Sequence, residues 1–230
     1  MKTIKLWDIP TRLFHWLLTA AIIGLFVTGR AGGSMIEWHG KLGILVVGLL
    51  AFRVVWGFIG STYARFGQFL PGPAAVIAYL KGSWHGLGHN PVGALSVCVL
   101  LGLTAFQAVS GLFTNDEIAF YGPLYRMVDP DFSTALTGYH SQVAYVLLAL
   151  VGLHVAAMIF YAVFKKDFLL MPMITGKKRV TEGESYQGGG IVAFGVALAI
   201  AALAVYAATG VWQPEPEPPP AVESAPAFDF

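Results

Sequence analysis

The stretch from Gly138 to Phe164 reads GYHSQVAYVLLALVGLHVAAMIFYAVF. A helix needs about 20 residues to cross the hydrocarbon core of a membrane, so this apolar run predicts a membrane-spanning helix. It contains His140 and His154, fourteen positions apart. Fourteen positions return a helix to within ~40° of its starting direction and advance it by about 21 Å. The stretch therefore predicts two imidazoles on one face of one helix, at two depths in the membrane.

Four further apolar stretches are long enough, or nearly so, to cross a membrane: residues 13–29, 42–60, 91–113 and 191–211. Only 12% of the residues are charged, against about 25% in an average soluble domain. The single cysteine, Cys98, excludes a disulfide, an Fe–S cluster or a haem c attachment held by this chain alone. The net charge of +1 gives no reason to expect nucleic acid as a partner. We predict an all-α integral membrane protein with a four-helix transmembrane bundle and a fifth C-terminal transmembrane helix.

Composition divides the chain into four parts. Residues 1–166 hold the four spans of the bundle, and residues 167–190 form a polar, glycine-rich linker. Residues 191–212 form the extra span, which has no histidine, and residues 213–230 form an acidic, proline-rich tail. Such a tail is expected to be extended or disordered.

The basic residues predict how the chain lies in the membrane. If the N-terminus is cytoplasmic, the inner side holds Lys2, Lys5, Arg12, Arg65, Lys81, Lys165, Lys166, Lys177, Lys178 and Arg179. The outer side then holds Arg30, Lys41 and Arg126. The positive-inside rule therefore predicts a multi-pass protein of the bacterial inner membrane, with a cytoplasmic N-terminus and a periplasmic C-terminus.

Local signals place some of the connections. Asn90 and Pro91 have the residue types of an N-cap and a first helical residue. The stretch 74–81 is expected to lie along the membrane interface, and residues 114–137 are expected to form a long outer loop with Asp-Pro at 129–130. Loops of that length are often functional.

Two more histidines match the depths of the first two. His39, at the outer end of the second span, is level with His140, and His15, near the inner end of the first span, is level with His154. Two histidines at each of two levels are the ligands that two haems b need, each iron taking one imidazole on either side of its ring. A plainer interpretation is an interfacial anchor for His15 and hydrogen-bonded core residues for the others. Ionisable residues inside a membrane are rare and indicate function by default, and the matched depths favour ligation.

Two basic residues are candidates for binding the haem carboxylates. Arg53 follows His39 by fourteen positions, so it should face a similar direction at the inner level. A buried arginine needs an anionic partner, which a propionate would supply; the alternative is a side chain that extends to the inner surface. Lys41, together with Arg30, could do the same for the outer haem. His89 is a weaker fifth candidate ligand; a hydrogen bond to a propionate or to the loop backbone, or a part in a proton path to quinone, is favoured over ligation.

Further motifs accompany these histidines. They are Trp7-Asp8-Ile9-Pro10-Thr11-Arg12-Leu13-Phe14-His15-Trp16, Trp38-His39, Arg53-Val54-Val55-Trp56-Gly57-Phe58-Ile59-Gly60, Tyr63-Ala64-Arg65-Phe66, Gly88-His89-Asn90-Pro91-Val92-Gly93, Ser110-Gly111-Leu112-Phe113 and Gly122-Pro123-Leu124. Over residues 6–166 the chain resembles the prokaryotic cytochrome b561 family, which includes the b-type cytochromes of Ni/Fe-hydrogenases. The resemblance implies an inner haem on His15 and His154, an outer haem on His39 and His140, and electron exchange with quinol or quinone. The fifth span and the tail depart from the usual four helices of the family.

These features predict a dihaem cytochrome b that moves electrons between the quinone pool and a periplasmic or membrane redox partner. The acidic outer surface is either simply solvated or a docking face for a basic c-type cytochrome, the first candidate partner, because complementary charge would speed association. The alternatives are a hydrogenase cytochrome b subunit and a stand-alone superoxide:quinone oxidoreductase. A rival of another class is a haem-free metal or proton transporter, but the spans show little of the mid-membrane polarity that such a protein needs. The sequence leaves open whether the chain is itself an enzyme, and also its oligomeric state.

Overall fold

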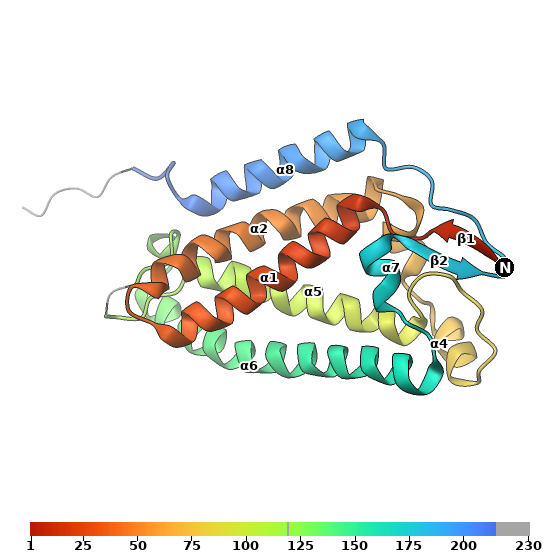
Figure 1. Ribbon diagram of the computed structural model, residues 1–230. Coiled ribbons are helices and arrows are strands. Elements are labelled where there is room, and N and C mark those ends of the chain that lie inside the picture. The colour runs from red at the N-terminus through yellow and green to blue at the C-terminus, as the bar shows by residue number, and fades with distance from the viewer. Residues whose placement is uncertain (119, 215–230) are drawn as a thin grey trace, which may run out of the picture.

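The computed structural model describes residues 1–118 and 120–214. Most of the predicted tail, from residue 215 on, therefore lies outside the described residues. Five long helices run side by side (Figure 1): α1 (Ile9–Ala31), α2 (Met35–Ile59), α5 (Pro91–Leu112), α6 (Pro130–Phe160) and α8 (Ile191–Thr209). Each is long and apolar enough to cross a membrane. The prediction of a helical, multi-pass membrane protein is confirmed.

Capping residues set where the long helices begin. Asn90 Oδ1 accepts a hydrogen bond from the Gly93 amide at 2.7 Å, and Pro91 is the first residue of α5, as predicted. The sequence predicts a loop as far as Thr137, but α6 already begins at Pro130. The Asp129-Pro130 pair, which has the composition of a turn, is instead the N-cap and first residue of α6, because Asp129 accepts from the Asp131 and Phe132 amides.

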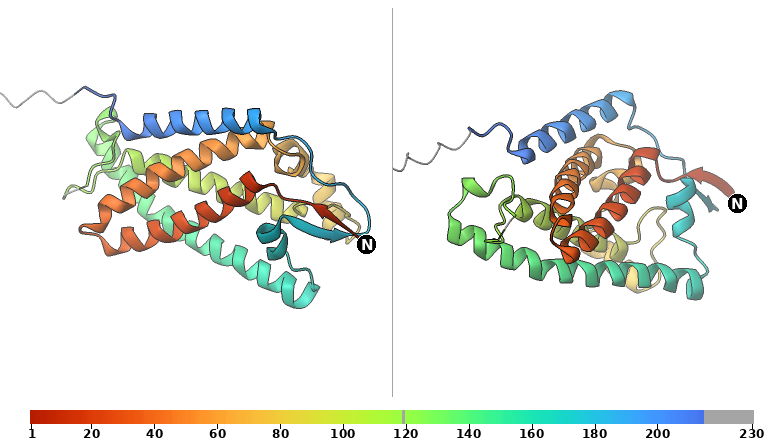
Figure 2. Two further views of the ribbon diagram at one scale, coloured as in Figure 1. Left: turned by 45° about the horizontal axis from the view of Figure 1, so that its top comes forward. Right: turned by 60° about the vertical axis from the view of Figure 1, so that its left-hand side comes forward.

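The bundle is built from two helix pairs. α1 packs against α2, α5 packs against α6, and α2 joins the pairs through its contact with α5. Ala21, Val46, Leu50 and Ala108 form a buried core shared by α1, α2 and α5. α6 lies on the side of the bundle opposite α8 in every view (Figure 2). The long outward face of α6 is apolar and available to lipid, with Leu153, Val155 and Ile159 among its exposed residues.

α8 lies against the outer side of α2. Ala197 and Ala201 are buried there against Phe52 and Trp56. A Cβ atom added at Gly48 would come within 2.6 Å of a Val205 methyl. Small residues at such contacts let membrane helices approach closely. Gly48 therefore serves the packing of the extra helix.

Small elements close the end of the bundle that carries the N-terminus. They are β1 (Lys2–Lys5), η1 (Thr62–Ala64), α3 (Phe66–Phe69), α4 (Pro73–Leu80), the π-helical turn η3 (Tyr161–Lys165), α7 (Leu170–Thr175) and β2 (Lys177–Val180), whereas η2 (Tyr125–Met127) lies in the loop before α6. β1 and β2 are antiparallel, with Lys2 opposite Val180 and Lys5 opposite Lys177. The segment 167–190, predicted as a plain linker, thus also ties the N-terminus to the end of α6.

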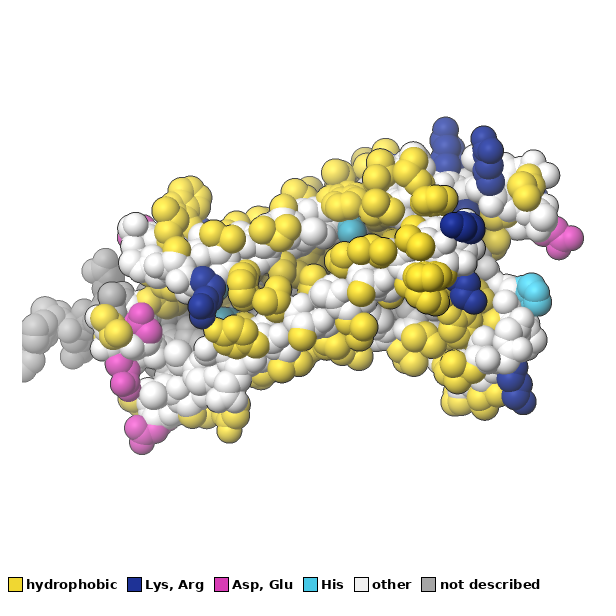
Figure 3. Space-filling view, turned by 60° about the horizontal axis from the view of Figure 1, so that its bottom comes forward, with side chains coloured by type: hydrophobic (Ala, Val, Ile, Leu, Met, Phe, Trp, Pro, Cys, Tyr) yellow, Lys and Arg dark blue, Asp and Glu magenta, His cyan; other side chains and the backbone are white. Residues whose placement is uncertain are grey.

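The two ends of the molecule differ in charge. Lysine and arginine side chains gather at the end with the N-terminus, and most acidic side chains in view lie at the opposite end (Figure 3). We call these the basic end, which carries β1, β2, α4 and α7, and the acidic end, which carries the α1–α2 and α5–α6 loops. Apolar side chains cover the surface between them (Figure 3), as expected for a protein that crosses a membrane.

Candidate functional site

His39 on α2 and His140 on α6 face each other near the acidic end. Their ring centroids are 6.1 Å apart and their planes are inclined by 78°. An imidazole nitrogen binds a metal at about 2.0–2.1 Å, and the ring centre lies about 1.1 Å behind that nitrogen, so two imidazoles on opposite sides of one ion have centroids about 6.3 Å apart. The observed separation matches that of two axial ligands of one iron.

Hydrogen bonds fix which nitrogen each of these histidines presents. Nδ1 of His39 lies 2.9 Å from the Leu25 carbonyl, which can only accept, so Nδ1 carries the proton. Nδ1 of His140 lies 2.9 Å from Ser110 Oγ, and that hydroxyl can donate to the Gln107 carbonyl at 3.3 Å while it accepts from Nδ1. Nε2 of both rings then keeps its lone pair for a metal. Metal-binding histidines commonly have such a partner on the other nitrogen.

A cavity of about 300 Å³ surrounds this pair. Its size is within the range of small-molecule and cofactor sites. The wall is mostly apolar and includes Ile22, Leu25, Phe26, Ile44, Val46 and Ala108. A Cβ atom at Gly29 would lie 2.9 Å from His39 Nδ1, and one at Gly111 would lie 3.1 Å from His140 Cε1. These two glycines therefore make room for the rings themselves, while Gly43 borders the cavity with no atom within 4 Å of an added Cβ.

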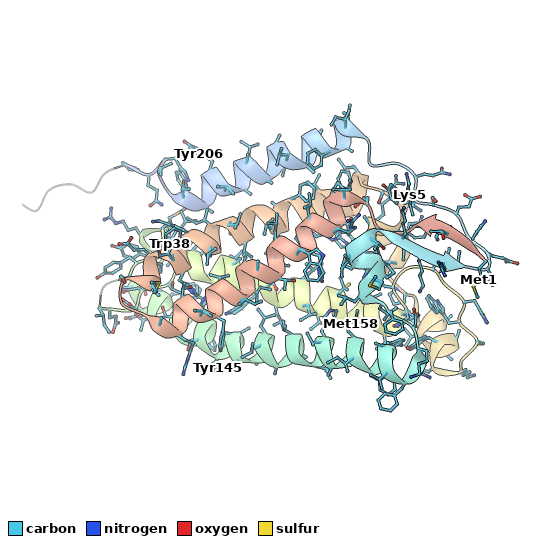
Figure 4. All side chains as sticks on the ribbon, viewed as in Figure 1. Met1, Lys5, Trp38, Tyr145, Met158 and Tyr206 are labelled. Carbon is cyan, nitrogen blue, oxygen red and sulfur yellow. The ribbon has the colours of Figure 1, made fainter. Side chains whose placement is uncertain are left out.

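The basic side chain beside this cavity is Arg30, not Lys41. Arg30 is part of the cavity wall and donates to the Tyr145 hydroxyl at 2.7 Å. Lys41 is exposed, 4.0 Å from Glu37 and 5.0 Å from the centre of the Trp38 ring. Trp38 and Tyr145 lie at the same end of the bundle (Figure 4). Lys41 therefore contacts surface groups, and Arg30 is the cation positioned to meet a ligand in the cavity.

His15 on α1 and His154 on α6 form the second pair, toward the basic end. The two rings are close enough to interact electrostatically. Nδ1 of His15 is shielded from solvent and has no hydrogen-bond partner among the described residues. Met158, one turn beyond His154, lies toward the basic end in Figure 4, far from Tyr145. The structure thus brings together the residues of each predicted pair, at two levels.

Two further polar side chains lie at this second level. Arg53 is buried, at 4% exposure, with its Cζ atom 4.8 Å from the centre of the Phe66 ring. His89 lies between two aromatic rings, with centroids 4.7 Å from Trp7 and 5.1 Å from Phe69. Burial, and next the positive charge of Arg53, lower the pKa of His89 to about 4. His89 is therefore neutral at physiological pH, and its shielded Nδ1 atom has no hydrogen-bond partner among the described residues.

A helical membrane bundle with paired histidines at two depths is the architecture of a membrane cytochrome b. Residues 6–176 match the model of the family described as Prokaryotic cytochrome b561, and the chain belongs to that family. Relatives of this chain are named as b-type cytochromes, and a b-type cytochrome carries haem b. The donor set fits that group, because two imidazoles present free Nε2 atoms across a largely apolar cavity.

Curated relatives are distant but cover most of the chain. A protein of Azotobacter vinelandii named "Probable Ni/Fe-hydrogenase B-type cytochrome subunit" is 25% identical over 212 residues, which cover 75% of this chain and 87% of that protein. A protein of the same name from Rhizobium leguminosarum bv. viciae is 22% identical, covering 80% of this chain and 92% of the relative. The "Probable Ni/Fe-hydrogenase 1 B-type cytochrome subunit" of Escherichia coli K12 is 20% identical, covering 74% and 88%. No solved structure matches the chain.

Proposed function

We propose that the chain is a dihaem cytochrome b that transfers single electrons across the bacterial inner membrane, between the quinone pool and a redox partner. The observation that carries this proposal is the geometry of the His39 and His140 pair. The rings are 6.1 Å apart and both Nδ1 atoms have hydrogen-bond partners. A second histidine pair about 21 Å deeper along α6 supplies a second relay point.

His39 and His140 would hold the outer haem, and His15 and His154 the inner one. When bound, each haem supplies a one-electron carrier. Held by two histidines each, the irons would have no site left for dioxygen, and the haems would act as electron relays. The apolar wall of the outer cavity would limit the access of water to a bound haem and so influence its potential.

The charge of the two ends supports an orientation with the basic end in the cytoplasm. β1 and β2 together carry Lys2, Lys5, Lys177, Lys178 and Arg179 at that end. The positive-inside rule then places the N-terminus in the cytoplasm and the end of α8 in the periplasm. The inner haem would lie near the cytoplasmic surface and the outer haem near the periplasmic surface.

Two classes of partner are supported by different observations. The names of the relatives favour a Ni/Fe-hydrogenase or a similar oxidoreductase, with this chain as its cytochrome b subunit. The exposed acidic residues Glu37, Asp129 and Asp131 at the acidic end favour a basic c-type cytochrome. α8, which lies outside the four-helix bundle, offers a further surface for either partner.

Haem counting tests the proposal directly. We expect two haems b per chain by pyridine haemochrome assay of the detergent-purified protein. His39→Ala and His15→Ala should each leave one haem, and His85→Ala is the control because His85 is an exposed loop residue. Zero haem in the wild type would overturn the proposal, and one haem would exclude the two-level pairing. If the purified protein holds haem that quinol does not reduce, the exchange of electrons with the quinone pool is refuted.

A further inference from the structure

Arg53 is a buried cation without a hydrogen-bond acceptor. Its guanidinium group has five N–H donors, yet it makes no hydrogen bond to any residue that the structure describes, and Nη1 is fully shielded from solvent. The carboxylate of Asp8 attracts it electrostatically. Both Asp8 oxygens are already engaged, Oδ1 by the Thr11 amide at 2.7 Å and Oδ2 by the Trp56 indole at 2.9 Å. A buried charge is stable only when it is paired and hydrogen-bonded, so Arg53 needs an additional acceptor.

His89 is a second polar group at the same place without a partner. Its Nδ1 atom is shielded from solvent and has no hydrogen bond within the described residues. The positive charge of Arg53 acts on its ring, as do His154 and His15 of the proposed inner haem. His89 thus lies close to both Arg53 and the inner ligand pair, although it comes from the loop that precedes α5.

Aromatic rings pack beside both of these groups. The Phe69 ring contacts both, with its centre 5.8 Å from Arg53 Cζ and 5.1 Å from the His89 centroid. The Phe66 ring packs against the Arg53 guanidinium. Gly57 leaves room for this ring, because a side chain at that position would overlap it. The rings restrict both polar groups and exclude water, so an anion bound there would make strong hydrogen bonds.

We propose that Arg53 and His89 form a carboxylate-binding site that holds one propionate of the inner haem. This inference rests on the dihaem function proposed above. Arg53 supplies the charge and its N–H donors, and His89 supplies one more donor to the same carboxylate. Arg53 is at the inner level because it follows His39 by fourteen residues along α2, which is about 21 Å of helix.

Redox titration of the inner haem tests the site. The His39→Ala background removes the outer haem, so that one haem is followed by its absorbance. Loss of a positive charge beside a haem favours the oxidised form. We expect Arg53→Gln to lower the ratio of reduced to oxidised haem at a fixed potential by about tenfold, equal to 59 mV for a one-electron couple. His89→Leu should shift the ratio in the same direction, whereas His89→Gln keeps an N–H donor and should stay near the parent value.

The two His89 variants separate haem binding from the pairing of Arg53 with Asp8, because neither substitution changes the charge of the site. If Arg53 only balances Asp8, His89→Leu and His89→Gln should titrate alike, and the proposal fails. Unchanged potentials in Arg53→Gln and in His89→Leu would also overturn it. If Arg53→Gln does not accumulate, the comparison of His89→Leu with His89→Gln decides. Absence of haem from the wild-type protein would instead reject the dihaem function itself.

Discussion

The hydroxyl of Ser110 allows a direct test of the proposed outer haem site. Ser110 is buried, at 3% exposure, and its Oγ lies 2.9 Å from His140 Nδ1. Ser110→Ala leaves that N–H shielded and without an acceptor, which costs about 1–3 kcal/mol. Loss of such a partner typically lowers metal affinity about 10–100-fold, which corresponds to about 1.4–2.8 kcal/mol. The two estimates agree, so we expect the outer haem to be held about 10–100-fold more weakly.

Transfer of haem to an excess of apomyoglobin measures this loss. In Ser110→Ala the outer haem should leave about 10–100-fold faster than in the wild type, while the inner haem is retained. Thr104→Ala is the matched control, because Thr104 is equally buried and borders the same cavity, but its hydroxyl bonds to the Leu100 carbonyl of its own helix. Equal transfer rates in Ser110→Ala, Thr104→Ala and the wild type would refute the role assigned to Ser110.

Two other substitutions test parts of the structure that the haem count does not. Gly29→Ala places a Cβ 2.9 Å from His39 Nδ1, so it should displace the His39 ring and remove most of the outer haem in a pyridine haemochrome assay. Gly102→Ala is the control, because its added Cβ meets nothing within 4 Å and haem should bind normally. Ala201→Leu overpacks the contact between α2 and α8 and should lower the free energy of unfolding by about 1–3 kcal/mol in a denaturant titration. Leu203→Ala changes an exposed residue of the same helix and is the control, with a free energy of unfolding near that of the wild type. Equal stabilities of the two variants would show that α8 is held in some other way.

The spans and the histidine pairs were predictable because both signals are local. Apolar length identifies a membrane helix, and the helical repeat alone places His140 and His154 on one face. The partners of the histidines were not predictable. Whether Ser110 faces His140 depends on how α5 and α6 are rotated against each other, and no spacing in the sequence encodes that rotation. The choice of Arg30 over Lys41 likewise depends on side-chain direction at the end of α1 and the start of α2.

Other features were missed because they join distant or ambiguous segments. β1 and β2 have four residues each and pair across most of the chain length, so neither is distinctive alone. Asp129-Pro130 occurs in turns and at helix starts alike, and only the amides of Asp131 and Phe132 show that it is a cap. The role of Gly48 was not predictable either, because a glycine in a membrane helix does not by itself show which helix packs against it; the position of α8 does.

The surroundings of the two histidine pairs predict different potentials for the two haems. At the outer level, the Leu25 carbonyl and the Ser110 hydroxyl accept from the ligand N–H groups, which makes the imidazoles more basic and favours oxidised iron. At the inner level, His15 Nδ1 has no such partner in the described part of the chain, which leaves its imidazole less basic and favours the reduced form. We therefore expect the inner haem to titrate at the higher potential. Electrons entering at the acidic end would then move toward the basic end. Redox titration of the wild type, assigned with His15→Ala and His39→Ala, checks this order, and a higher potential for the outer haem would show that the hydrogen bonds to the histidines do not control the direction.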